Sequence, residues 1–279
     1  MRSDYDLHVH STFSDGTCSP QLLIEMALRH GLNGIAITDH DTLDGLQEAS
    51  QFINDNSIEL EFIPGIELNT ESGVSDNEVH ILGYFIDYNC MRFKTRLLEI
   101  REQRQNRARK MVDKLNRLGC KISYETVVNI AGSDLIARPH IARAMVEAGY
   151  AADTDQAFNN YLEYGKPAYV KRYKFPSLEA IELIKESGGI AVLAHPGLIK
   201  NQTIVTNLID RGIDGLEVYY PQHSNQQIKN YLQLAQGNNL LITGGSDYHG
   251  PGSSEKRAKL GAAGIDSDLM TILKAYKNK

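Results

Sequence analysis

The sequence predicts an α/β fold in which seven strands alternate with helices to form a barrel. Seven short apolar runs, rich in β-branched residues and bounded by glycine or proline, are typical of buried strands. Helical patterns separate most of these runs, which indicates parallel strands joined by right-handed crossovers. The length of 279 residues leaves room for one large domain of this kind and an insertion. The seven runs cover residues 6–10, 34–40, 62–67, 79–85, 189–195, 212–220 and 240–249.

The helices between these runs are predicted from their caps and from the spacing of their apolar residues. Ser19 and Pro20 supply an N-cap and a first-turn proline, and apolar residues then recur at helical spacing until Gly31. Seven strands suggest a barrel one unit short of the common eight. Further helical patterns cover residues 43–52, 178–185, 226–235 and 266–277.

Most of the predicted strands carry a histidine, aspartate or glutamate at or just past their end. His8 and His10 are two residues apart, as are Asp247 and His249, so each pair points to one side of a strand. Barrel enzymes build their active sites from the ends of different strands. A single such histidine is equally well explained as a hydrogen-bonded core residue. Many imidazoles and carboxylates on one rim would be costly to bury without metal ions, so the sequence predicts a metal centre.

The stretch between the fourth and fifth runs has no strong strand pattern and predicts a helical insertion over residues 91–175. A long helix is expected over about 92–118, and Ser123 is expected to cap a second helix that ends near Gly132. Pro139 is expected at the first position of a third helix, and residues 153–156 resemble the capping box of a fourth. We expect the barrel to comprise residues 1–90 and 176–279 and the insertion to cover the metal rim as a lid.

Six motifs together resemble the PHP (polymerase and histidinol phosphatase) family. They occur in family order and span nearly the whole chain. The resemblance implies a distorted (β/α)7 barrel, which agrees with the seven runs counted above, with the insertion between strands four and five. The motifs lie at residues 6–16, 37–41, 64–67, 79–80, 193–196 and 245–249.

The resemblance also implies three neighbouring metal positions and the residues that hold them. The first position would take His8, His10, Glu67 and Asp247. The second would share Glu67 and add His80 and His195, and the third would take Asp15, His40 and His249. Catalytic roles are expected for Glu67, Asp247 and His195. Many family members have histidine where Asp15 stands, and this harder oxygen ligand favours Mn2+ or Mg2+ at the third position. Two or three ions per chain are expected, with Mn2+ first and Zn2+, Fe2+ or Mg2+ as alternatives.

Basic residues concentrate in the predicted insertion. Residues 92–117 hold ten Lys and Arg against three Asp and Glu, a local charge of +7 in a chain of net charge −6. These charges could steer polyanionic substrates or form an ordinary solvated helix face. Arg138 and His140 are expected near a helix N-terminus, where backbone N–H groups favour phosphate, and Lys166 lies on a loop bounded by glycine and proline. His223, after the sixth strand, is a further candidate substrate contact, with helix capping and ion pairing as the alternative for the other three.

Both insertion segments resemble the stand-alone PHP phosphatases that act on nucleoside 3′,5′-bisphosphates and short oligoribonucleotides. The resemblance implies a metal-dependent phosphoesterase that removes the 3′-phosphate of such bisphosphates, with 5′→3′ trimming of short 5′-phosphorylated RNA as a second activity. A hydroxide activated by the metal ions would attack phosphorus. The alternatives are a histidinol-phosphate phosphatase or other small-phosphomonoester phosphatase, an amidohydrolase, and a noncatalytic metal- or RNA-binding module.

Composition narrows the class and the cellular setting. No apolar run approaches the roughly 18 residues that span a bilayer, and the first residues lack the apolar stretch of a signal peptide. Three cysteines without CxxC spacing argue against a disulfide framework or a thiolate zinc site. We therefore expect a cytoplasmic enzyme whose partners are a small nucleotide and short RNA, with no membrane contact and no stable protein partner.

Overall fold

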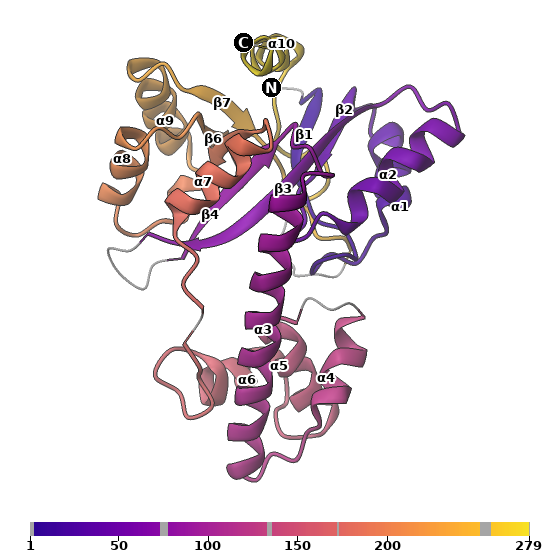
Figure 1. Cartoon of the computed structure of the whole chain (residues 1–279), viewed down its shortest axis with the longest axis vertical. Coiled ribbons are helices and arrows are strands. Elements are labelled where there is room, and N and C mark those ends of the chain that lie inside the picture. The colour runs from indigo at the N-terminus through magenta and orange to yellow at the C-terminus, as the bar shows by residue number, and fades with distance from the viewer. Residues whose placement is uncertain (1–2, 73–77, 133–135, 172, 252–257, 279) are drawn as a thin grey trace. The chain divides into compact units, whose positions relative to one another are not determined.

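The computed structural model describes residues 3–72, 78–132, 136–171, 173–251 and 258–278 (Figure 1). The chain divides into two compact units: unit 1 comprises residues 1–94 and 175–279, and unit 2 comprises residues 95–174. No helix among the described residues is long and apolar enough to span a bilayer.

Unit 1 is a seven-stranded, nearly closed barrel whose strands follow one another in chain order. A parallel bridge between Val9 and Tyr248 and a 2.8 Å hydrogen bond from the Asp247 N–H to the His8 carbonyl bring its two edges together. The α/β barrel and its seven strands are thus as predicted. The strands are β1 (Tyr5–Val9), β2 (Gly34–Ile37), β3 (Glu61–Glu71), β4 (Glu78–Tyr84), β5 (Ile190–Leu193), β6 (Gly215–Tyr219) and β7 (Leu241–Gly244).

One strand departs from the expected parallel arrangement. β4 runs antiparallel to both of its neighbours, β3 and β5, whereas the other neighbouring pairs are parallel. The connection between β3 and β4 spans only residues 72–77, and a parallel crossover needs about a dozen residues. The expectation of seven parallel strands was therefore wrong at this strand.

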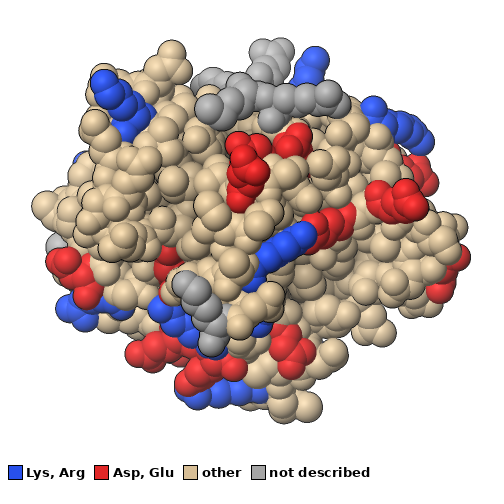
Figure 2. All heavy atoms as spheres, turned by 90° about the horizontal axis from the view of Figure 1, so that it is seen from above, with Lys and Arg blue, Asp and Glu red and all other residues tan. Residues whose placement is uncertain are grey.

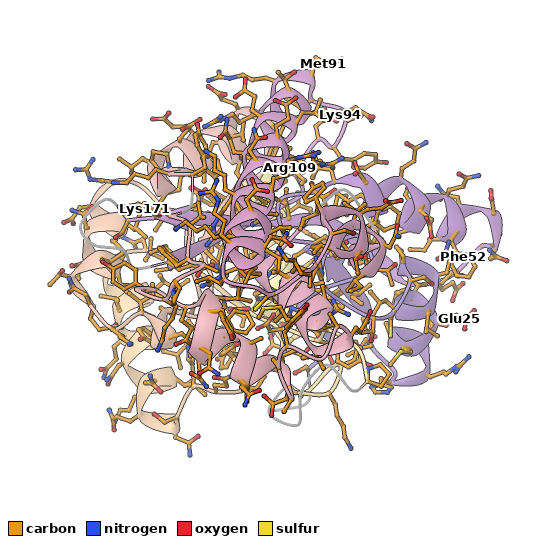
Figure 3. The ribbon with its side chains drawn as sticks, turned by 90° about the horizontal axis from the view of Figure 1, so that it is seen from below. Glu25, Phe52, Met91, Lys94, Arg109 and Lys171 are labelled. Carbon is orange, nitrogen blue, oxygen red and sulfur yellow. The ribbon has the colours of Figure 1, made fainter. Side chains whose placement is uncertain are left out.

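The helices of unit 1 surround the strands. α1 and α2 lie on one side of the strand layer and α8 and α9 on the other (Figure 1), and Glu25 and Phe52 mark the outer parts of α1 and α2 in Figure 3. The Ser19 hydroxyl accepts the Leu22 N–H, which confirms the predicted N-cap of α1. The helix α8 and the short helix η2 were not predicted. These helices are α1 (Pro20–Arg29), α2 (Asp44–Asp55), α7 (Ser177–Glu186), η2 (Pro196–Leu198), α8 (Thr203–Asp210), α9 (Asn225–Gly237) and α10 (Ser267–Lys277).

α10 closes the end of the barrel where the parallel strands begin. Asp4, just before β1, accepts the Ser267 N–H at 3.1 Å. The Lys274 ammonium reaches Glu61, the first residue of β3, at 2.6 Å, and the Tyr276 hydroxyl donates to Asp214, just before β6, at 2.8 Å. The part of the barrel interior next to this helix is filled by apolar residues such as Leu7, Ile63 and Val192. The opposite end, where the parallel strands finish, is left for polar side chains.

Unit 2 is all helical and has a core of its own, built from residues such as Met111, Leu115, Val127 and Ile141. The Ser123 hydroxyl accepts the Thr126 N–H, as predicted, and the helix it caps ends at Gly132 with φ of 64°. The helix α5 has Ala137 as its N-cap, so Pro139 occupies the second helical position and not the first. The helices are α3 (Met91–Arg117), which begins in unit 1, α4 (Tyr124–Ala131), α5 (Arg138–Glu147), α6 (Thr154–Ala157) and η1 (Phe158–Leu162).

Candidate metal centre

Nine ligand-type side chains meet at the end of the barrel opposite α10. They come from six of the seven strands or from the residues that directly follow them. His80 lies near the start of β4, and it joins the others because β4 is reversed, so that its first residues lie beside the last residues of β3 and the residues after β5. The nine side chains are His8, His10, Asp15, His40, Glu67, His80, His195, Asp247 and His249.

Glu67 lies at the centre of this cluster and faces five histidines. Its Oε2 atom lies 3.1 Å from His8 Nε2, from His10 Nε2 and from His40 Nδ1. Its Oε1 atom lies 2.7 Å from His80 Nδ1 and 3.1 Å from His195 Nε2. Each oxygen therefore serves a different set of imidazoles, which is the geometry of a carboxylate that bridges two cations.

The donor atoms fall into three overlapping groups in which every atom lies within 4.8 Å of the others. The first group is the set expected at the first position, whereas the second contains His40 in place of the expected His195 and the third gains His10. In the second group His40 accompanies Glu67 and His80, with His195 adjacent through Glu67, and in the third group His10 joins the expected three residues. The groups are His8, His10, Glu67 and Asp247; then His40, Glu67 and His80; and then His10, Asp15, His40 and His249.

The donor atoms of the cluster are better suited to binding divalent cations than to forming hydrogen bonds with one another. His8 Nε2, His10 Nε2, Glu67 Oε2 and His249 Nε2 are buried and make no hydrogen bond to any described residue. Buried polar atoms without partners are rare in native proteins and call for an ion or a water. Imidazole nitrogen and carboxylate oxygen without thiolate suit Mn2+, Fe2+ and Zn2+ alike. The cluster can therefore hold metal ions, and its chemistry leaves their identity open.

Electrostatics inside the cluster favour anionic carboxylates. Burial raises the pKa of Glu67, but the surrounding histidines outweigh it and hold the pKa well below its usual range. The same balance lowers the pKa of Asp15 and of Asp247. Burial lowers the pKa of His8, yet Glu217, Glu67 and Asp247 raise it well above its usual range. A pocket with this field attracts cations.

Several residues that the sequence did not single out contact the ligand-type residues or the loop that carries one of them. The Tyr220 hydroxyl donates to Asp247 Oδ2 at 2.9 Å. Asn69 Nδ2 lies 3.0 Å from His40 Nδ1 and 3.0 Å from Asp41 Oδ2. Asp39 accepts the hydroxyls of Ser11 and Ser14, both at 2.5 Å, and so shapes the loop before Asp15. Their signal in the sequence is only proximity to the ligand motifs, because each acts on a neighbour that folding brings near.

Backbone geometry at the rim is strained. Asp41, His195 and Asp247 have φ of 50°, 28° and 55°, in the left-handed region that side chains disfavour. Gly245 permits the close approach of this rim to β1, since a Cβ atom there would lie 2.2 Å from the His8 Cβ. The surrounding hydrogen bonds hold these conformations in place.

The expected substrate residues lie in two places. In unit 2, Arg138 begins α5 with its guanidinium 5.6 Å from the Phe158 ring centroid, buried His140 accepts the Ala137 N–H through Nδ1 at 3.2 Å, and Lys166 is exposed after η1. In unit 1, His223 donates from Nδ1 to the Val218 carbonyl at 2.9 Å and accepts the Gly197 N–H at Nε2 at 3.0 Å. Both of its ring nitrogens are engaged with backbone, so the expected phosphate contact of His223 is not supported.

A seven-stranded barrel with histidines and carboxylates grouped at one end is the arrangement of a barrel enzyme whose active site can bind metal ions. The PHP domain model matches residues 6–242, and the chain belongs to the PHP family. It is a metal-dependent phosphoesterase of that family.

Known proteins resemble the chain over most of its length. A 5′-3′ exoribonuclease Rnm from Salmonella typhimurium is 34% identical over 252 residues, covering 88% of this chain and 85% of that protein. A 3′,5′-nucleoside bisphosphate phosphatase from Chromobacterium violaceum is 34% identical over 257 residues, covering 90% and 88%. A solved structure from Bifidobacterium adolescentis, assigned as a metal-dependent phosphoesterase, is 30% identical with a TM-score of 0.84, covering 97% of this chain and 95% of that one.

Proposed function

We propose that this enzyme removes the 3′-phosphate of nucleoside 3′,5′-bisphosphates and also trims short 5′-phosphorylated RNA from its 5′ end. The observation that carries the proposal is the first turn of α5 in unit 2. This turn carries a basic residue, and it belongs to a different part of the chain from the metal cluster. Arg138 occupies the first position of α5, where backbone N–H groups and the helix dipole favour phosphate. Relatives named for a bisphosphate and for RNA both have substrates with a phosphate beside the one cleaved.

In this proposal the barrel residues bind the scissile phosphate through metal ions. His8, His10, Glu67 and Asp247 hold the first position; Glu67, His80 and His195 hold the second; and Asp15, His40 and His249 hold the third. We propose Mn2+ as the resident ion because Asp15 adds a hard oxygen ligand to the imidazoles of the third position. Ions bound there would neutralise charge on the phosphate oxygens and lower the pKa of water.

The residues of the chain do the remaining work in the proposed mechanism. Glu67 fixes the distance between the first and second positions, because each of its oxygens faces a different set of histidines. Tyr220 holds Asp247 in one orientation through its hydroxyl. His195 Nε2 lies 3.1 Å from Glu67 Oε1 and would complete the second position there. Arg138, His140 and Lys166 bind the phosphate that is not cleaved and so position the scissile group.

We also propose that the enzyme works in the cytoplasm. Cys18, Cys90 and Cys120 are all free thiols, and a reducing compartment would keep them so.

Hydrolysis of three substrates tests the proposal, measured as inorganic phosphate for the two phosphomonoesters and as released mononucleotides for the RNA. The substrates are 3′,5′-bisphosphoadenosine, histidinol phosphate and a 5′-phosphorylated RNA pentamer, each assayed after chelation and after addition of Mn2+ or Ca2+. We expect the bisphosphate to be hydrolysed with the highest kcat/KM, with activity lost on chelation and restored better by Mn2+ than by Ca2+. Preference for histidinol phosphate would reject the substrate assignment, and full activity in protein shown to be metal-free by elemental analysis would reject the mechanism.

A further inference from the structure

A second carboxylate lies behind the metal cluster, on the side away from Glu67. Glu217 belongs to β6 and is fully buried in a strand whose other members are apolar or glycine, apart from half-buried Tyr219. Burying a carboxylate is costly unless hydrogen bonds compensate it. Its two oxygens have different partners, and those partners belong to two different metal positions.

One oxygen of Glu217 orients His8. Glu217 Oε1 lies 2.8 Å from His8 Nδ1, so the carboxylate accepts the Nδ1–H of the imidazole. This contact fixes the tautomer in which His8 Nε2 carries the lone pair. That Nε2 atom lies 3.1 Å from Glu67 Oε2 and 3.5 Å from Asp247 Oδ1, within the first position.

The other oxygen of Glu217 holds the backbone of His195. Glu217 Oε2 accepts the His195 N–H at 2.7 Å. His195 has φ of 28° and ψ of 58°, a conformation that needs support from its surroundings. The support directs His195 Nε2 to within 3.1 Å of Glu67 Oε1, in the second position.

We infer that Glu217 is a positioning residue that ties the first and second metal positions together from behind, as Glu67 does from the front. Both of its contacts are N–H donors, so the role needs two acceptor oxygens on one side chain. A glutamine offers only one acceptor, and its amide NH2 would face a donor. The inference rests on the metal assignment proposed above, and it predicts that a single substitution behind the cluster weakens both positions at once.

The test is a metal titration of Glu217→Gln. Mn2+ bound per chain is measured by elemental analysis after gel filtration, with His8→Ala and His80→Ala as references that each remove one position. We expect Glu217→Gln to weaken both positions together by about 10- to 100-fold, the range for outer-shell partners of metal ligands. The exchange-coupled electron paramagnetic resonance signal of neighbouring Mn2+ ions should fade in parallel. Saturating Mn2+ should recover part of kcat and leave KM nearly unchanged.

Asp214→Asn is the matched control. Asp214 lies just before β6, is buried, and accepts the Ala191 N–H at 2.9 Å, but it contacts none of the nine ligand-type residues among its recorded partners. This variant should lower the thermal stability and leave Mn2+ affinity unchanged. An equal loss of affinity in both variants would make the Glu217 effect one of general destabilisation and overturn the inference.

The remaining outcomes are equally decisive. Loss of one position only, or of none, in a folded Glu217→Gln variant overturns the joint role. If that variant does not fold, 15N NMR of metal-loaded wild-type protein decides, since the inference requires His8 to carry its proton on Nδ1. A His8 ring without that proton overturns it. If wild-type protein binds no divalent metal at all, the proposed function fails first, and the two failures are thus distinguishable.

Discussion

Five histidines of the metal cluster lie around the two oxygens of Glu67. Replacing it by glutamine removes the shared negative charge and one acceptor without changing side-chain size. We expect Glu67→Gln to lower kcat for 3′,5′-bisphosphoadenosine by at least about a hundredfold, a magnitude scaled from other electrostatic catalytic groups. Glu71→Gln, on the same strand, is the control and should retain activity. A Glu67→Gln variant with near-wild-type kcat would show that Glu67 is not the bridge.

Asp15 is the ligand-type residue that sets the third position apart. Its Oδ1 atom lies 3.2 Å from His249 Nε2, so the group is assembled although an oxygen replaces the imidazole common in the family. Because imidazole binds borderline metals more strongly than a single carboxylate oxygen, Asp15→His should retain a third Mn2+ or Zn2+ that wild-type protein loses on gel filtration. Elemental analysis before and after filtration measures this. Unchanged stoichiometry would count against Asp15 as a ligand of the third position.

His223 must be neutral in the folded protein, since its Nε2 accepts a hydrogen bond that protonation would abolish. Burial lowers the pKa of His223. A lowered folded-state pKa contributes stability above the ordinary value of about 6.5, and that stability is lost as the pH falls. In metal-free protein, the free energy of unfolding in urea should therefore drop more for wild type than for His223→Gln between about pH 7.5 and about pH 5, by about 1 kcal/mol. Equal drops would mean that His223 titrates normally.

The grouping of the nine ligand-type residues was predictable from the sequence because each lies in or beside a short motif that resembles the PHP family. The residues that orient the ligands were not, because Asn69, Tyr220 and Asp39 act across strands. Glu217 accepts a hydrogen bond from His8. Its second contact, to the His195 backbone, depends on a local conformation that no sequence pattern indicates.

At the scale of elements, the first turn of α5 is proposed to make the enzyme prefer a bisphosphate over a simple phosphomonoester. Arg138→Ala should reduce kcat/KM for 3′,5′-bisphosphoadenosine by about 2–3 kcal/mol, the cost of a lost charge-assisted contact, and Arg138→Lys should recover only part of it. p-Nitrophenyl phosphate has no second phosphate and should be affected far less. Arg143→Ala, exposed on the same helix, is the matched control. Equal losses on both substrates would remove the main support for the bisphosphate.

Some basic side chains of the long helix α3 bind another segment of the chain, so the number of charges on this helix does not by itself indicate a function. Arg96, Arg107 and Lys114 are spaced by eleven and seven residues and so lie on one face of the helix. Lys114 donates to the Tyr169 carbonyl at 2.6 Å, Arg107 to the Val170 carbonyl at 2.8 Å, and Arg96 to the Tyr173 hydroxyl at 3.0 Å. These three cations fasten the segment that leads back toward unit 1. Part of the +7 charge is therefore structural, a use that was not considered from the sequence.

The direction of β4 could not be predicted from apolar alternation, because a strand pattern is the same in both directions. The short connection before it was the available clue. That clue was hidden because β3 continues to Glu71, beyond the expected end at Glu67.

At the scale of the whole molecule, charge is divided between the two units. Unit 2 holds 15 Lys and Arg against 9 Asp and Glu, a net charge of +6, which leaves −12 for unit 1. The face seen in Figure 2 shows acidic and basic side chains interspersed. A basic unit raises the local concentration of a polyanion, and salt screens this attraction.

Ionic strength therefore provides a test of the charge division. Raising NaCl from about 0.05 M to about 0.3 M should lower kcat/KM several-fold for the bisphosphate and more for the RNA pentamer, which carries more charge. p-Nitrophenyl phosphate should change least. A salt dependence that is the same for all three substrates would indicate an effect on the metal centre and not on unit 2.

The left-handed backbone at Asp41, His195 and Asp247 also determines how the chain would respond to laboratory evolution. Each such residue costs about 1–2 kcal/mol relative to a relaxed backbone, and glycine would relieve most of it. Selection for heat resistance alone should therefore accumulate glycine or asparagine at these positions and yield variants with higher thermal stability and little catalytic activity. Selection for both heat resistance and catalytic activity should leave all three residues unchanged and yield stabilising substitutions at other positions. At these three positions, greater thermal stability is therefore expected to cost activity.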